Sequence, residues 1–381
     1  MKKEKLSNFE GIMFVAGSGI GTGILTLPYA INKIGLFGTL IAVLVAYIVS
    51  AILYLMICEM TRNSKNSKEL LGILNEHLFY GKFGKVLSII FFIVLILMII
   101  QNLIVYILCG SEILTNLLSI NLVTSKIIFY VISSLVILSG IRGITNGEKV
   151  SVSLISAVIL TLSVLALFNI QRGITIGFGE PKKVLAVYGL FMFAFSSIFS
   201  VVQVTNYLKD KKSIRKVALT GLSLNALLTI IFAFISIIGS KEITTIATIG
   251  LSETLNSTLI KYMCSAFVLL AMFSSYWTSG LAFTDIVENS LKMKRKTAWI
   301  ISTIPTIIIA LLLPMSILDF IQIGAGALSI ILVLVIIPAY SHAVKKEKDP
   351  LLGSFAKSKL LLIMTAVFTV IMAISSLIPL D

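Results

Sequence analysis

The chain carries near its start a run, GSGIGTG, that lies within a longer apolar segment. Gly17, Gly19, Gly21 and Gly23 occupy every second position of this run. Each glycine costs about 1 kcal/mol relative to alanine inside a helix, so a helix is expected to break here. A break in hydrocarbon leaves backbone N–H and C=O groups unpaired, at several kcal/mol each, unless they line a cavity and meet a ligand. The run therefore predicts a binding site made of backbone groups.

The chemistry of such a break indicates the ligand. N–H groups at the start of a half-helix suit a carboxylate, and carbonyl groups at the end of the other half suit an ammonium group or a cation. A zwitterionic amino acid offers both charges. The alternative is close helix packing, because Gly17 with Gly21, and Gly19 with Gly23, form GxxxG pairs. Four glycines with Ser18 and Thr22 exceed what a packing face needs, which favours binding.

A second interrupted segment follows later in the chain. It reads VYGLFMFAFSSIFSVVQVTNYL and carries Gly189, then Ser196, Ser197 and Ser200 at mid-span. Paired interruptions in corresponding segments are the best sequence indication of a transporter binding site.

The elements that must position these two breaks are membrane spans. Of the 381 residues, 57% are apolar and 13% are charged, and the mean hydropathy is +1.05. These values predict an all-α polytopic membrane protein. The basic residues lie in short clusters without an aromatic-laced basic face, so nucleic acid is not an expected partner. The three cysteines fall in apolar stretches and predict no disulfide framework.

At roughly 20 apolar residues per span, the sequence predicts eleven transmembrane helices, of which the first and sixth are discontinuous. Five spans are an odd number, so two groups of five start on opposite sides and form an inverted repeat. The expected halves are 11–170 and 185–342, with 359–379 as an extra helix and 1–381 as a single transmembrane domain. The expected spans are 11–35, 37–60, 85–115, 125–141, 150–170, 185–207, 217–239, 259–287, 298–315, 318–342 and 359–379.

Most of the 31 basic residues fall between spans on the side of the N-terminus. The positive-inside rule therefore predicts a cytoplasmic N-terminus and an extracellular C-terminus. The preference for lysine over arginine and the abundance of isoleucine indicate an AT-rich prokaryote, and hence its cell membrane. The bilayer is thus one expected partner, and the protein is expected to act as a monomer.

The segments GSGIGTGILTLPYAINKIGLFG and LYLMICEMTRNS resemble the first two spans of the amino acid/auxin permease family. That family belongs to the amino acid, polyamine and organocation transporter superfamily. The resemblance implies a LeuT-like 5+5 fold and secondary active transport of an amino acid by alternating access, with spans 1 and 6 moving against a scaffold.

The resemblance also implies a set of substrate-binding residues. The backbone of the first break would hold the substrate carboxylate, and the second break would hold the amino group and face the side chain. The Tyr106 hydroxyl would help to hold the carboxylate, as tyrosines of span 3 do in this fold, or else form an interhelical hydrogen bond. The phenylalanines of span 6 favour a neutral substrate with an apolar or aromatic side chain. The set is Gly17, Ser18, Gly19, Ile20, Gly21, Thr22, Gly23, Tyr106, Phe193, Ala194, Phe195, Ser196 and Ser197.

A coupling cation, H+ or Na+, is the other expected ligand, and no tightly bound cofactor is expected. Span 8 presents Ala271, Ser274 and Ser275 at i, i+3, i+4 spacing, and their oxygens suit Na+ together with Gly17 and Ile20. In sodium-coupled relatives of the resembled family an asparagine stands at the position of Gly17, so one ligand is missing here. The same spacing recurs one turn later, and interhelical hydrogen bonding explains the hydroxyls equally well.

The remaining charged residues are expected to have structural roles. Lys149 is expected to snorkel to the interface, and Asp285 and Glu288 to be a solvated helix end rather than a gate ion pair. An enzyme is not expected, because His77 and His342 lie far apart and no metal-ligand spacing is present. The open alternative is a sensor of the same fold, such as a germinant receptor subunit, that binds an amino acid without transport.

Overall fold

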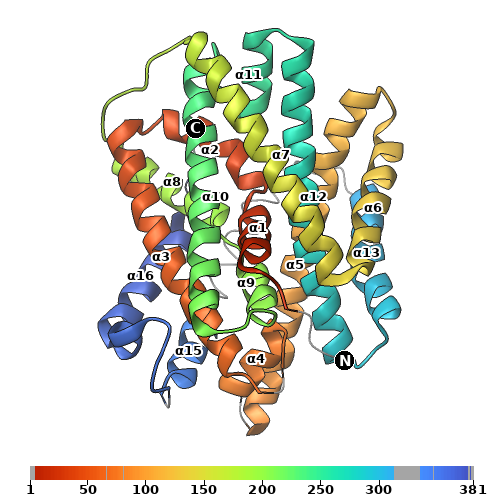
Figure 1. The fold of residues 1–381 in the computed structure, drawn as a ribbon, viewed down its shortest axis with the longest axis vertical. Coiled ribbons are helices and arrows are strands. Elements are labelled where there is room, and N and C mark those ends of the chain that lie inside the picture. The colour runs from red at the N-terminus through yellow and green to blue at the C-terminus, as the bar shows by residue number, and fades with distance from the viewer. Residues whose placement is uncertain are drawn as a thin grey trace.

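The structure is a computed structural model and describes residues 5–65, 67–79, 81–312, 335–345, 347–375 and 378. All regular structure within these ranges is helical, so the all-α prediction is confirmed for them. The helices (Figure 1) are α1 (Asn8–Gly19), α2 (Thr22–Asn32), α3 (Gly35–Asn63), α4 (Leu70–His77), α5 (Gly81–Leu118), α6 (Leu122–Leu138), α7 (Gly140–Phe168), α8 (Pro181–Ala194), α9 (Ile198–Thr205), α10 (Lys211–Gly239), α11 (Ala247–Leu255), α12 (Thr258–Ser290), α13 (Arg295–Leu312), α15 (Ile337–Ala343) and α16 (Lys359–Ser375).

Seven segments of the described chain are long and apolar enough to cross a bilayer, with α8 and α9 counted together as 181–205. The pair α1 and α2 is bent by 59° at its break and makes an eighth if taken as one span. The helices α6 and α16 are shorter, with 17 residues each. The predicted span 318–342 lies largely outside the described residues, so the count of eleven remains a prediction.

Helix α7 begins ten residues earlier than the sequence predicted for its span, at Gly140 rather than near residue 150. The turn from α6 is only Ser139 long, because Gly140 adopts a φ of 66° that a residue with a side chain rarely takes. The polar stretch that follows, RGITNGEK, resembles a loop in sequence but is helical in the structure. Glu148 and Lys149 consequently lie inside a helix.

Helix α1 occupies the middle of the bundle, with α7, α10 and α12 packed against it (Figure 1). Its Phe14, Val15 and Ala16 are completely or almost completely buried. The broken helix therefore has protein, not lipid, on every side where its backbone is open.

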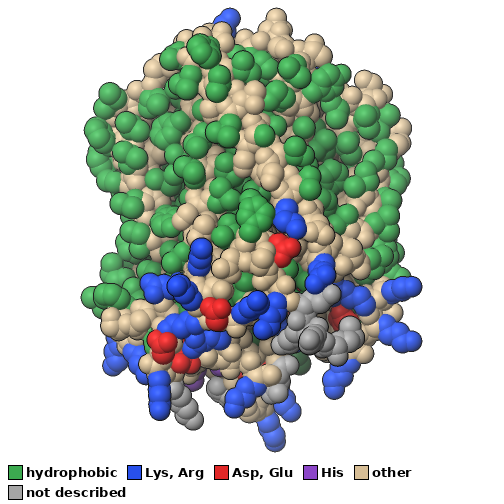
Figure 2. Space-filling view, in the orientation of Figure 1, with side chains coloured by type: hydrophobic (Ala, Val, Ile, Leu, Met, Phe, Trp, Pro, Cys, Tyr) green, Lys and Arg blue, Asp and Glu red, His purple; other side chains and the backbone are tan. Residues whose placement is uncertain are grey.

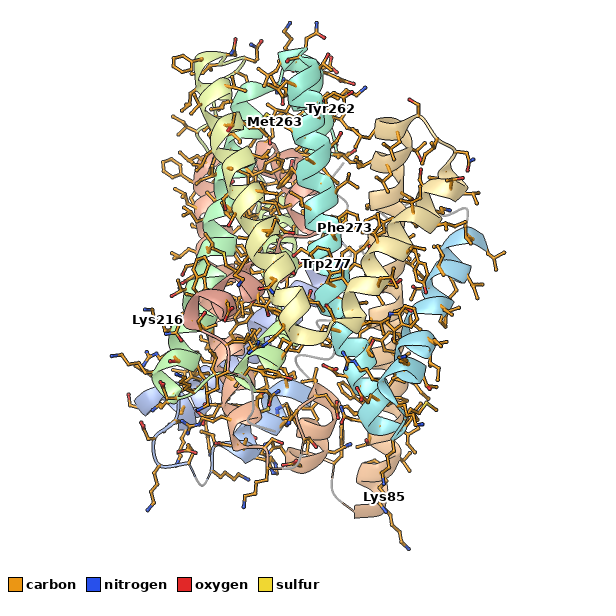
Figure 3. The ribbon with its side chains drawn as sticks, turned by 45° about the vertical axis from the view of Figure 1, so that its right-hand side comes forward. Lys85, Lys216, Tyr262, Met263, Phe273 and Trp277 are labelled. Carbon is orange, nitrogen blue, oxygen red and sulfur yellow. The ribbon has the colours of Figure 1, made fainter. Side chains whose placement is uncertain are left out.

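The charged side chains are distributed unevenly over the surface. Figure 2 shows the Lys and Arg side chains gathered toward one end of the visible face and hydrophobic side chains covering the rest. Lys85 lies at this end and Tyr262 and Met263 lie toward the other (Figure 3). We call the first the basic end.

Candidate functional site

The four glycines of the first break each face a different helix at very short distance. A Cβ atom at any of these positions would push against a neighbour, so close packing does use the glycines. The nearest atoms to such a Cβ are Glu148 Oε2 for Gly17 (1.9 Å), Asn225 Nδ2 for Gly19 (2.2 Å), Ser275 Oγ for Gly21 (2.9 Å) and Ala194 Cβ for Gly23 (3.1 Å).

The same break also opens onto a cavity of about 60 Å³. The end of α1, the start of α2 and the residues between α8 and α9 meet there, so the two interrupted segments face one space. Most of the predicted substrate set lines it: Ser18, Gly19, Gly21, Thr22, Gly23, Tyr106, Phe193, Ala194, Ser196 and Ser197. Three predicted residues do not line it, namely Gly17, Ile20 and Phe195. Binding by the others remains a prediction.

The cavity has further lining residues that the predicted set lacks. Asn102 and Met98 of α5 lie about one and two helical turns from Tyr106, respectively, on the same face. Phe199 of α9 adds a ring, and Thr278 with Ser279 of α12 adds hydroxyls. The cavity thus combines open backbone at the two breaks with large apolar side chains and a few polar groups.

The second break is held by a side chain from a distant helix. The hydroxyl of Tyr54, on α3, donates to the carbonyl of Phe195 at 2.6 Å and accepts from the backbone N–H of Ser197 at 3.0 Å. Tyr54 is 2% exposed. Two backbone groups freed by the break are thus satisfied inside the protein, as the membrane interior requires. Sequence reasoning missed Tyr54, because no local pattern marks its partner 141 residues away.

The two breaks are also joined to each other. Ser18 Oγ and Ser200 Oγ share a hydrogen bond of 2.6 Å between α1 and α9. Asn225 of α10 donates to the carbonyl of Ala194 at 2.9 Å, and its side chain lies against Gly19. These contacts make the two interrupted segments one connected unit, with Asn225 as a second residue that the sequence did not single out.

The predicted cation ligands lie close together but face a group that was not predicted. Ser275 donates to the carbonyl of Ile20 at 3.3 Å, which joins α12 to the first break. Ser274 instead donates to Glu148 Oε2 at 2.6 Å, and Gly17 faces the same oxygen. Ala271 is fully buried. Cation binding by these residues remains a prediction. Glu148 was missed because the predicted span began after it.

A larger cavity, of about 590 Å³, lies beside the first. Thr22 lines both cavities. The larger cavity is bordered by Glu112 of α5 and by Lys261 of α12, which is adjacent to Tyr262 at the end opposite the basic end (Figure 3). The larger cavity therefore adjoins the first break on the side away from the basic end.

Ion pairs connect helices that pack around the site. Lys149 does not snorkel freely, because its Nζ lies 3.1 Å from Glu10 Oε1 and joins α7 to α1. The prediction that Asp285 and Glu288 form a solvated end of α12 is also wrong, because Arg295 of α13 pairs with Glu288 at 2.9 Å and with Asp285. Charged side chains that were expected to face solvent or the membrane interface therefore form ion pairs between helices.

Comparison with known proteins identifies the class. The fold is similar to that of Mhp1, a nucleobase-cation-symport-1 family transporter, with a TM-score of 0.69, 15% identity and coverage of 99% of this chain and 92% of that one. It is similar to MhsT, solved in complex with L-phenylalanine, with a TM-score of 0.70, 12% identity and coverage of 99% and 100%. The protein therefore has the LeuT-like transporter fold, as the resemblance implied.

The chain belongs to the tryptophan/tyrosine permease family, whose pattern it matches over residues 4–376. It is accordingly a multi-pass membrane transport protein and not an enzyme. The comparisons support the LeuT-like superfamily and not, specifically, the amino acid/auxin permease family that the first two spans resemble. No curated protein sequence gives a significant match.

Proposed function

We propose that the protein is a secondary active transporter that imports a neutral aromatic amino acid, coupled to a cation, by alternating access. The observation that carries the proposal is the meeting of two helix breaks at one cavity. The N-terminus of α2 presents N–H groups that no side chain caps, and these suit the substrate carboxylate. The carbonyl end of α8 reaches the same cavity at Phe193 and Ala194 and suits the ammonium group, because a carbonyl that accepts one hydrogen bond, as that of Ala194 does from Asn225, keeps a second lone pair.

The composition of the cavity supports an aromatic side chain. Phe193, Phe199 and Met98 supply large apolar surfaces, and Asn102 is one of several polar residues that also line the cavity. Asn102 has no hydrogen-bond partner within the described part of the chain, so it is available to a polar atom of a ring. The family description, tryptophan/tyrosine permease, and the L-phenylalanine bound to MhsT agree with this substrate class.

The charge distribution supports an orientation with the basic end in the cytoplasm. The cavity of about 590 Å³ then opens to the outside, which suits import. The inverted repeat of halves 11–170 and 185–342 and a prokaryotic cell membrane belong to the same proposal.

Uptake into proteoliposomes tests this function. Purified protein is reconstituted, and labelled tryptophan, tyrosine, phenylalanine and alanine are supplied under an imposed pH gradient or Na+ gradient. We expect accumulation of the aromatic amino acids under one gradient, and stronger than that of alanine. Accumulation of none of them under either gradient, with substrate-induced stabilisation of the protein, would instead identify a sensor.

A matched pair of glycine variants tests the site. Gly21→Leu places a side chain against Ser275 Oγ at the break and is expected to abolish uptake. Gly173→Leu is the control, because a Cβ at Gly173 meets nothing within 4 Å. Undiminished uptake by Gly21→Leu would show that the first break is not the binding site.

A further inference from the structure

Glu148 is a buried acid that the proposed substrate site does not use. It lies in α7, and its side chain is 0% exposed. Its Oε2 accepts the hydrogen bond from Ser274, whereas its Oε1 has no hydrogen-bond partner among the described residues. A carboxylate ordinarily accepts several hydrogen bonds or pairs with a cation when it is buried. The Glu148 carboxyl has a single hydrogen bond among the described residues, fewer than a buried carboxylate needs.

The charged groups of the helices packed against α7 do not neutralise Glu148. Its neighbour Lys149 pairs with Glu10 of α1, and Lys126 of α6 donates to the carbonyl of Ala310. Ser274 follows Phe273, which lies between the ends of α12 near its middle (Figure 3). The charged residues of α10 and α12 lie toward the helix ends, at Lys211, Lys212, Arg215, Lys216, Lys261, Asp285 and Glu288.

An ionised and unpaired carboxylate at this depth would be costly, and such residues in membrane proteins mark ion pathways. A small cation that binds reversibly is therefore the best source of the positive charge that would neutralise Glu148. We propose that Glu148 binds the coupling cation, a proton or Na+, with Ser274 as its partner from α12. This inference rests on the proposed function, since it assigns the coupling step of that transport.

The position of Glu148 explains how the cation acts on the substrate site. Gly17, against which the carboxyl lies, precedes the break by less than one turn. Ser274 binds Glu148, and the adjacent Ser275 binds the carbonyl of Ile20 within the break. A change in charge at Glu148 therefore reaches the open backbone of α1 both directly and through two consecutive residues of α12.

The test compares wild type with Glu148→Gln, which keeps the size of the side chain but is permanently neutral. Exchange of labelled for unlabelled substrate without any ion gradient is measured beside gradient-driven accumulation. We expect Glu148→Gln to retain exchange and to lose accumulation by at least tenfold. The gradient that drives the wild type distinguishes a proton from Na+.

Two further variants keep the result interpretable. Glu180→Gln is the matched control, because Glu180 is largely exposed and pairs with Lys183 in the first turn of α8, the helix that it precedes; it is expected to behave as wild type. Ser274→Ala removes the partner and keeps the acid, and should shift the proton or Na+ concentration for half-maximal transport by threefold or more.

The outcomes separate the two proposals. Accumulation by Glu148→Gln at the wild-type level would overturn the cation site. So would a wild type that exchanges substrate but accumulates none under either gradient. Loss of exchange in Glu148→Gln, with an unchanged ion dependence in Ser274→Ala, would overturn it too. Absence of both exchange and accumulation in the wild type would instead refute the proposed transport function.

Discussion

At the scale of single residues, one hydroxyl replaces the helical hydrogen bonds lost at the second break. Tyr54 binds one backbone carbonyl and one backbone N–H there. Buried backbone groups left without partners cost about 1–3 kcal/mol each. The side chain that closes a break is thus as important to the site as the residues that open it.

Tyr54→Phe is expected to destabilise the protein by about 2–6 kcal/mol, because it leaves two buried groups unpaired at about 1–3 kcal/mol each. Thermal unfolding in detergent, with and without substrate, measures the change. Tyr47→Phe is the control on the same helix, since its hydroxyl contacts Ser223 at an exposed position. Equal unfolding temperatures for the two variants would show that the Tyr54 bridge is not formed.

The same scale shows what the sequence reveals about the site. The glycine run and Ser196 with Ser197 stand out locally, because these residues are unusual inside a membrane helix. Tyr54, Asn225 and Glu148 are ordinary in their own segments. Their roles arise only when helices distant in sequence pack together, which no local pattern reports.

At the scale of elements, the strongest predictions concern long apolar helices and the weakest concern their ends. The predicted span 217–239 corresponds to α10, Lys211–Gly239, whereas the start of α7 differs by ten residues. Hydropathy places a boundary where polar residues begin, yet a helix continues wherever neighbouring helices accept its polar side chains. The short helices α4 and α11 were not predicted for a different reason: each is too short to carry a periodic hydrophobic signal.

Helix α4 provides a prediction about pH. Its N-cap Glu69 accepts hydrogen bonds from Leu71 and Gly72, both at 2.7 Å. Burial raises the pKa of Glu69 from its ordinary value of 4.5 to about 7. The folded protein therefore holds a proton that the unfolded chain loses between these values, so this group makes stability fall as pH rises through that window.

Glu69→Gln removes this titration. We expect the unfolding temperature of the wild type to fall relative to that of the variant between pH 5 and pH 8, as measured by a thermal shift assay. A constant difference between the two proteins across this range would contradict the raised pKa.

At the scale of the whole molecule, ion pairs decide how firmly the broken helix is tied to its surroundings. The Glu10–Lys149 pair links α1 to α7, and both side chains are about 30% exposed. Such a pair contributes less than about 1 kcal/mol. The Glu10–Lys149 ion pair is therefore weak enough to break when α1 moves relative to α7.

Glu10→Gln breaks this tie and leaves the N-terminal cap of α1 in place, because glutamine can still accept from the Ser7 N–H. We expect amide hydrogen exchange over residues 8–19 to become faster, by up to about fivefold, which corresponds to the loss of one exposed pair. The control is Lys183→Gln, because the partner of Lys183 is Glu180, three residues away at the N-cap of the same helix. Exchange that is unchanged in Glu10→Gln would show that the pair does not restrain α1.

The long-range closure of the first break has a consequence for how the chain is made. The carbonyl of Ile20 meets Ser275, which follows it by 255 residues. At synthesis rates of about 5–20 residues per second, roughly 10 to 50 seconds separate the two. During that interval the first span is in the membrane without the partners that satisfy its open backbone. The nascent protein must therefore keep this segment hydrated, in contact with the insertion machinery, or temporarily helical, until its later helices arrive.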